Sequence, residues 1–271
     1  SFCRGHSTDA RRYFEQSVDV CEKHSIIDRL TISRINLVEV HHLTGNLRKG
    51  LDLADRTVSH AREVDHRYGV ALGLRYRALS LTDIGRVNEA AENARRALRI
   101  QRELGNPEDI LGTLTILARA YLACTEREAA SETIEEALTL VHHGDTEGFH
   151  PVLLAWKARL LAIDGEVDAA QDCLVMANQA QGRKYPHQQV RFKLNIARVH
   201  ESLDEPERAM ALAEEALRQA DSCGYRFYAM RARQIAARVT PDEVVRGRHS
   251  RVANALARSL AASLPREDAE L

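Results

Sequence analysis

The sequence repeats itself with a period of 40 residues. Residue types common in turns recur at intervals of 40, 40, 40, 40 and 39 positions: Gly5, Gly45, Gly85, Thr125, Gly165 and Asp204. Five positions after each of them stands a small residue: Ala10, Gly50, Ala90, Ala130, Ala170 and Ala209. A fixed period of this size indicates a stack of supersecondary units, each burying its apolar face against its neighbours. The chain is therefore predicted to be a solenoid.

Apolar residues follow a helical spacing on both sides of each turn, so every unit is predicted to be a pair of helices. The predicted pairs are 26–44/47–65, 68–83/87–104, 107–123/127–142, 148–163/167–181 and 186–202/206–222. A lone second helix at 7–23 precedes them, and another first helix, ending at Val239, follows them. The pattern thus extends over almost the whole chain.

Small residues mark where the paired helices are expected to approach most closely. An alanine stands seven residues before four of the turn positions: Ala78, Ala118, Ala158 and Ala197. A glycine in the turn supplies a positive φ at little cost. Because Thr125 and Asp204 replace glycine, those two turns are expected to have a different geometry.

The sequence predicts two parts, a repeat array over residues 1–240 and a terminal part over 241–271. In the second part, Thr240-Pro241-Asp242-Glu243 has the spacing of a capping box with proline in the first turn, which predicts a helix from Pro241. We expect this helix, to about Leu264, to cap the array and the tail after it to fray. Since the chain begins with serine inside a repeat, it is expected to be a segment of a longer protein.

The clearest repeat reads Leu114-x-x-Leu117-Ala118-x-x-Tyr121, then Ala130-x-x-x-Ile134-x-x-Ala137. This pattern resembles the tetratricopeptide repeat, although the period is longer than the usual length of about 34 residues and the terminal proline is missing. Long-period arrays of this kind are similar to the helical regions of bacterial multidomain signalling proteins. The resemblance implies an all-α solenoid with a right-handed superhelix, whose first helices line a concave groove that binds a peptide or helix.

Composition and motifs argue against several classes of function. The net charge of −1 does not suit a globally basic nucleic-acid binder, and no apolar run approaches the roughly 18 residues of a membrane span. Five cysteines without a CxxC motif predict reduced thiols and a cytoplasmic protein. Phosphate-loop, HExxH and GxSxG motifs are absent, so neither an enzymatic activity nor a cofactor is expected.

No metal site is expected either. His142, His143, Asp145 and His150 form a local cluster, but their spacing matches no standard metal motif, and we interpret them as a solvated loop.

The implied groove carries a row of arginines. The resemblance places the residue after each close-contact position in the groove, namely Glu39, Leu79, Arg119, Arg159, Arg198 and, in the last repeat, Arg238. Neighbouring helices pack about 8–10 Å apart, so such a row is unfavourable unless acids intervene or an anionic partner neutralises it. Two interpretations stay open: salt bridges to glutamates of the second helices, or binding of an acidic segment.

Further residues are predicted near this row. Arg75, Arg191 and Asn195 would extend the patch on the same helices. Trp156, the only tryptophan, is either core filler or a binding anchor that faces the groove.

The function predicted from the sequence is a non-catalytic interaction scaffold, whose groove binds an acidic peptide or helix of a partner protein or of another domain of the same chain. The alternative is a regulatory, effector-sensing or self-association domain of a larger signalling ATPase, kinase or transcription activator. A third possibility, nucleic-acid binding through the eight arginines between Arg226 and Arg258, is disfavoured because stacking aromatics and a helix-turn-helix pattern are missing.

Overall fold

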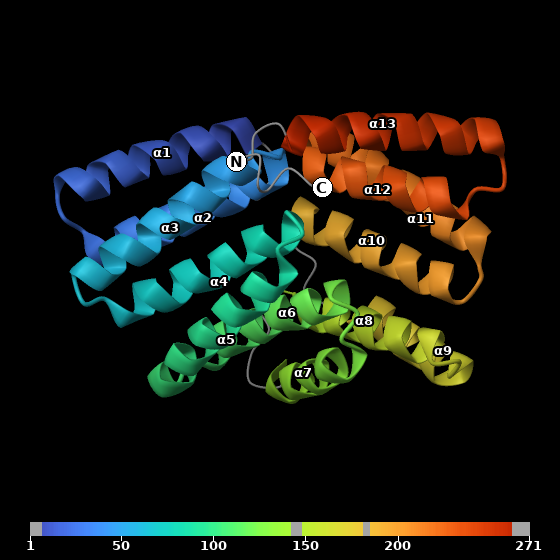
Figure 1. Ribbon diagram of the computed structural model, residues 1–271, viewed down its shortest axis with the longest axis horizontal. Coiled ribbons are helices and arrows are strands. Elements are labelled where there is room, and N and C mark those ends of the chain that lie inside the picture. The colour runs from blue at the N-terminus through green and yellow to red at the C-terminus, as the bar shows by residue number, and fades with distance from the viewer. Residues whose placement is uncertain (1–6, 142–147, 181–184, 262–271) are drawn as a thin grey trace. The chain divides into compact units, whose positions relative to one another are not determined.

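The computed structural model describes residues 7–141, 148–180 and 185–261, and these residues form helices and no strand (Figure 1). The helices are α1 (Ser7–Lys23), α2 (Ile27–Thr44), α3 (Leu47–Glu63), α4 (Arg67–Asp83), α5 (Val87–Leu104), α6 (Pro107–Ala123), α7 (Arg127–Leu140), α8 (His150–Ile163), α9 (Val167–Gln179), α10 (Pro186–Ser202), α11 (Pro206–Cys223), α12 (Arg226–Val239) and α13 (Glu243–Ala261). Every predicted helix is present, with ends within a few residues of the prediction, and the predicted all-α solenoid class is confirmed.

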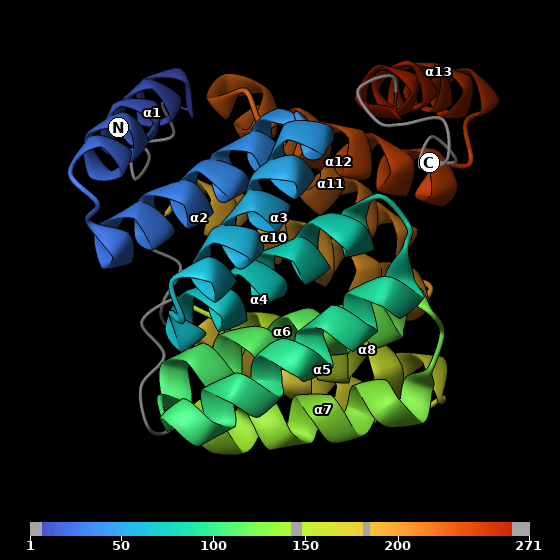
Figure 2. The ribbon, with the colours of Figure 1, turned by 60° about the vertical axis from the view of Figure 1, so that its left-hand side comes forward.

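The helices group into two compact units. The N-terminal unit contains α1–α7, and the C-terminal unit contains α8–α12 with α13 as far as Ser259. In the N-terminal unit, successive helices pack as antiparallel neighbours, and the first helices α2, α4 and α6 also contact one another (Figures 1 and 2). In the C-terminal unit, α10 contacts both α8 and α12 in the same way. The second helices of successive repeats have at most marginal contacts within either unit. The first helices therefore form the closely packed layer of each unit.

All five described turns at the 40-residue period have the same left-handed geometry. The φ angles are 79° at Gly45, 84° at Gly85 and 85° at Gly165, but also 62° at Thr125 and 58° at Asp204. In each turn the next backbone N–H donates to the carbonyl five residues earlier, as from Arg86 to Leu81 at 2.9 Å and from Glu126 to Tyr121 at 3.0 Å. This hydrogen bond closes the helix end and requires a left-handed residue before it, whatever its side chain. The expected different geometry at Thr125 and Asp204 was therefore wrong.

A second series of left-handed residues joins one repeat to the next. Ser25, Asp65 and Gly105 have φ angles of 54°, 50° and 77°, and Gly224 has 70°. The first three are also spaced by 40 residues, yet the sequence analysis missed them because only one of the three is a glycine.

The contact alanines have the predicted role. Ala78, Ala118, Ala158 and Ala197 are all 0% exposed. In the last repeat the register shifts by one position, because Ala236 is buried while Ala237 is partly exposed. Arg238 is thus not an in-register copy of Arg119, contrary to the sequence analysis.

The start of α13 also differs from the prediction. The Asp242 carboxylate accepts hydrogen bonds from the backbone N–H groups of Val244 and Val245 at 2.8 and 3.0 Å, so Asp242 caps the helix and Pro241 lies before it. The capping role of α13 towards the array stays a prediction, and the tail from Pro265 lies outside the described residues.

The turns allow a test of backbone strain. A β-branched residue in the left-handed region costs about 1–2 kcal/mol, and the Cβ position at Gly85 meets no atom within 4 Å. We expect Gly85→Thr to lower the free energy of unfolding by about 1–2 kcal/mol. Thr125→Gly should raise it by up to about 1 kcal/mol, since the greater freedom of the unfolded chain offsets part of the gain.

Urea denaturation followed by circular dichroism measures both changes. Thr125→Ala serves as the control, because alanine keeps most of the backbone penalty. A loss of stability in Thr125→Gly larger than in Thr125→Ala would contradict the strain argument.

Candidate functional site

The predicted groove residues lie on first helices, but in both units. Arg75 and Arg119 belong to α4 and α6 of the N-terminal unit. The others belong to α8, α10 and α12 of the C-terminal unit: Trp156, Arg159, Arg191, Asn195, Arg198 and Arg238.

Arg119 is neutralised inside the N-terminal unit. Its guanidinium forms an ion pair with the carboxylate of Asp83, which is 1% exposed at the end of α4. The other carboxylate oxygen of Asp83 lies 2.7 Å from Nδ1 of His42, which is buried on α2. One buried carboxylate thus links the first helices α2, α4 and α6, and the charge of Arg119 has its partner within the fold.

Arg75 is a packing residue rather than a groove residue. It is 4% exposed, and its guanidinium lies 3.7 Å from a carboxylate oxygen of Asp109 and 5.4 Å from the ring centre of Tyr76. It also fills the space beside Gly112, where an added Cβ would come within 2.3 Å of the guanidinium. The glycine therefore makes room for a buried arginine between α4 and α6.

Arg238 is also paired within the fold. Its guanidinium donates to both carboxylate oxygens of Glu201 on α10, at 2.5 and 3.0 Å. Asp83 and Glu201 both lie in the last turn of a first helix, so the bridging acids are not on second helices as predicted. Asp83 precedes Arg119 by 36 residues and Glu201 precedes Arg238 by 37. This spacing equals one repeat of 40 residues less one helical turn. An acid at this spacing before an arginine is therefore the sequence signal for these two ion pairs.

Two more arginines of the C-terminal unit have contacts within it. The Arg191 guanidinium lies 5.8 Å from the ring centre of Phe149, a cation–π arrangement. Its Nε atom is buried without a hydrogen-bond acceptor. Arg198 is partly buried on α10 and engaged within the fold.

Arg159 is the exception in this series. In the part of the chain that the structure describes, the Arg159 side chain has no hydrogen bond or ion pair, and its Nε is buried without an acceptor. Burial lowers the pKa of its guanidinium from the ordinary value, Glu201 raises the pKa and Arg238 lowers it. The positions 36 and 37 residues earlier are Ala123 and Leu122, so the sequence supplies no acid at that spacing. Arg159 is therefore a partly desolvated cation, whose buried Nε–H has no acceptor among the described residues.

Trp156 and Asn195 are brought together in the C-terminal unit. The indole Nε1–H of Trp156 donates to the side-chain oxygen of Asn195 at 3.0 Å, and Trp156 is 7% exposed. The hydrogen bond joins α8 to α10 and satisfies the polar atom of the ring. Of the two interpretations, core filler describes Trp156, and its buried ring is not presented as a binding anchor.

The described residues were also searched for a metal site and for a membrane-spanning helix. There, no group of three histidines, cysteines or acids is placed to hold a metal ion. Of the histidine cluster, His142, His143 and Asp145 lie outside the described residues, and His150 begins α8. Within the same ranges, no helix is both long and apolar enough to cross a bilayer.

The bridge at Asp83 is expected to stabilise the N-terminal unit strongly. Asp83→Asn leaves the charge of Arg119 without its buried partner, and breaking a buried pair in this way costs about 3–5 kcal/mol. Urea denaturation should show a loss of this size. Asp52→Asn is the control, because Asp52 is 57% exposed beside Arg48 and should change stability by less than about 1 kcal/mol. Equal effects of the two substitutions would contradict the role of the bridge.

His41 makes the stability depend on pH. Burial lowers the pKa of His41 to about 4, with smaller effects of Lys49 and Arg11. The unfolded chain takes up this proton near pH 6.5, whereas the folded chain does so only near pH 4. The free energy of unfolding should therefore fall by up to about 3 kcal/mol as the pH drops from 6.5 to about 4. Above pH 6.5 this contribution to stability is retained in full.

Urea denaturation at several pH values between 4 and 6.5 tests whether His41 causes this pH dependence. The test compares substituted chains with the unsubstituted chain. His41→Gln should have a shallower pH dependence than the unsubstituted chain, whereas substitution of the exposed His24 should keep the full slope. An unchanged slope in His41→Gln would refute it.

Comparison with known proteins agrees with the fold. The family model described as the MalT-like TPR region matches residues 1–266. The crystal structure of BtubC (BKLC) from P. vanneervenii superposes with a TM-score of 0.56 at 20% sequence identity, over 80% of this chain and 90% of that one. At this identity the likeness shows the fold alone. A search of curated protein sequences finds no match. Since the family model covers nearly the whole sequence, the chain belongs to the family of the MalT-like TPR region.

Proposed function

We propose that the chain is a non-catalytic protein-interaction module whose C-terminal unit binds an acidic segment, supplied by a partner protein or by another domain of the same chain. Tetratricopeptide-like repeats generally mediate protein interactions, which supports the first part of this proposal. The observation that carries the second part is the partly buried Arg159, whose buried Nε–H has no acceptor and whose guanidinium has no ion pair among the described residues.

An anionic ligand would remove the unfavourable feature of this site. A desolvated charge without a partner is costly, and a carboxylate can accept two parallel hydrogen bonds from one guanidinium. Arg159 and Arg198 hold the same position in successive first helices, and Glu201 already bridges to Arg238. Because α8 and α10 are in contact, a carboxylate-bearing segment across them would meet more than one cation.

The N-terminal unit is not part of this proposal. There Asp83 and Asp109 hold Arg119 and Arg75, so neither guanidinium needs an external anion. The capture mechanism that the sequence suggested for Arg119, Arg159 and Arg198 together is therefore replaced by one centred on Arg159.

Binding of a labelled oligoglutamate peptide, followed by fluorescence anisotropy, tests the site. Arg159→Gln removes one charge-assisted contact and should weaken binding about tenfold or more. Its free energy of unfolding should change little, because the substitution removes a partly buried charge that forms no hydrogen bond or ion pair with another described residue.

Arg218→Gln is the matched control. Arg218 is a 70% exposed arginine on the second helix α11, so its loss changes the net charge equally without touching the site. Equal affinities of the two variants, or a loss of several kcal/mol of stability in Arg159→Gln alone, would refute the proposal.

A further inference from the structure

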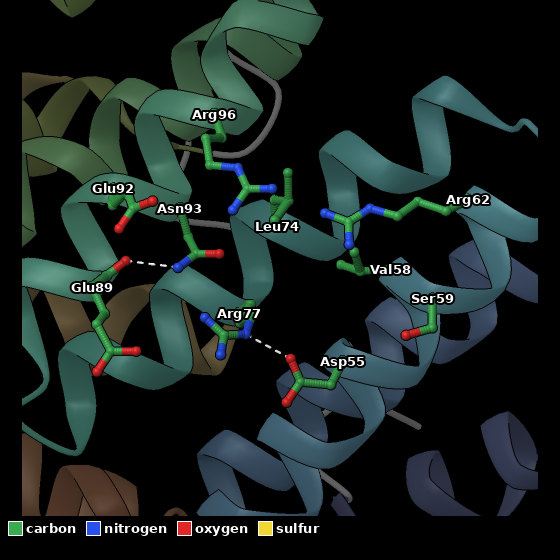
Figure 3. Close-up of a pocket in the computed structure, with 10 residues that line it drawn as sticks. All are labelled: Asp55, Val58, Ser59, Arg62, Leu74, Arg77, Glu89, Glu92, Asn93 and Arg96. Atoms are coloured by element: carbon green, nitrogen blue, oxygen red, sulfur yellow. Dashed lines mark hydrogen bonds and ion pairs between the residues drawn. The ribbon is translucent and has the colours of Figure 1, made fainter.

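A polar cleft opens on the second-helix side of the N-terminal unit. It has a volume of about 440 Å³ and lies among α3, α4 and α5 (Figure 3). Its lining residues are Asp55, Val58, Ser59, Arg62, Leu74, Arg77, Glu89, Glu92, Asn93 and Arg96. Only two of the ten, Val58 and Leu74, are apolar. A cleft of this size can hold a small molecule, but its lining favours a hydrophilic one.

Part of the polar lining is satisfied within the fold. The Arg77 guanidinium donates to the carboxylate of Asp55 at 2.5 Å. The carboxylate of Glu89 accepts from Arg86, which lies outside the cleft, at 2.6 and 2.7 Å. The Asn93 amide donates to the backbone oxygen of Glu89 at 2.7 Å. These groups shape the cleft without leaving a charge free in it.

Arg62 and Arg96 are different. Neither guanidinium has a hydrogen bond or an ion pair with another residue in the part of the chain that the structure describes. Arg62 comes from α3 and Arg96 from α5, and Figure 3 shows both guanidinium groups extended towards the opening above Leu74. Arg96 forms no ion pair with Glu92, although the two are one turn apart on α5. Two cations converge here from opposite walls.

An anion between the two groups would relieve their mutual repulsion. Like charges facing each other repel, and a guanidinium can donate two parallel hydrogen bonds to one phosphate or carboxylate. A phosphate has enough oxygens to accept from both arginines at once, which a single carboxylate does less well. The geometry therefore favours a phosphate group over a single carboxylate.

We propose that this cleft binds a small phosphorylated molecule, with its phosphate held between Arg62 and Arg96. The Ser59 hydroxyl and the Asn93 side-chain oxygen line the same cleft and can contact hydroxyl groups of the ligand. The site shares no residue with the acidic-segment site of the C-terminal unit, so either proposal can fail without the other. Under the alternative function of an effector-sensing domain, the effector would be a small phosphorylated molecule.

Isothermal titration calorimetry at constant ionic strength tests the proposal, with inorganic phosphate and glycerol phosphate as probes and glycerol as the neutral control. Both anions should bind with a Kd of about 1 mM or tighter, and glycerol should not bind. Arg62→Gln and Arg96→Gln should each weaken phosphate binding about tenfold. Tighter binding of glycerol phosphate than of inorganic phosphate would show that the organic part also contacts the cleft.

Arg99→Gln is the matched control on the same helix. Arg99 is exposed on α5 and does not line the cleft, so phosphate affinity should stay unchanged. Circular dichroism confirms that each variant is folded. The proposal is overturned if neither anion binds saturably below about 10 mM, or if Arg62→Gln and Arg96→Gln bind phosphate as well as Arg99→Gln.

Discussion

The fold depends on the close approach of helices at a buried alanine next to a left-handed turn. The turn fixes where each first helix ends, because its backbone hydrogen bond reaches back five residues. The alanine, 0% exposed in four successive copies, then lets the neighbouring helix approach without a large side chain between them. Since both features return every 40 residues, the same packing is regenerated along the chain. The side chains between these fixed points are left free to differ from repeat to repeat.

This close packing decides the state of the charged residues. When first helices contact one another, an arginine of one helix lies near the last turn of the helix before it. Asp83 and Glu201 occupy that turn and neutralise Arg119 and Arg238. At the same spacing before Arg159 the sequence has Ala123 and Leu122, neither of which is an acid. An acid 36 or 37 residues earlier is thus present for Arg119 and Arg238 but not for Arg159 or Arg198.

Periodicity was sufficient to predict the helices and the contact alanines, since both depend on local spacing. The turn geometry predicted for Thr125 and Asp204 was wrong, because the backbone hydrogen bond and not the residue type imposes that geometry. Periodicity also treated the arginines as equivalent. Their difference depends on residues a full repeat away, which become neighbours only through helix packing. The cleft with Arg62 and Arg96 escaped notice for the same reason, as its walls come from helices of different repeats.

The two proposed sites differ in the helices that form them: Arg159 lies on a first helix, whereas the cleft lies between second helices α3 and α5 with residues of α4. First helices are held close together, so an unpaired cation among them is desolvated and binds an anion strongly through few contacts. Second helices of successive repeats barely contact each other, so they leave room for a wider cleft that stays hydrated. Ligand affinity in such a cleft must come from several converging polar groups rather than from desolvation. The first kind of site suits one anchoring carboxylate of an extended segment, whereas the second suits a small, multiply charged molecule.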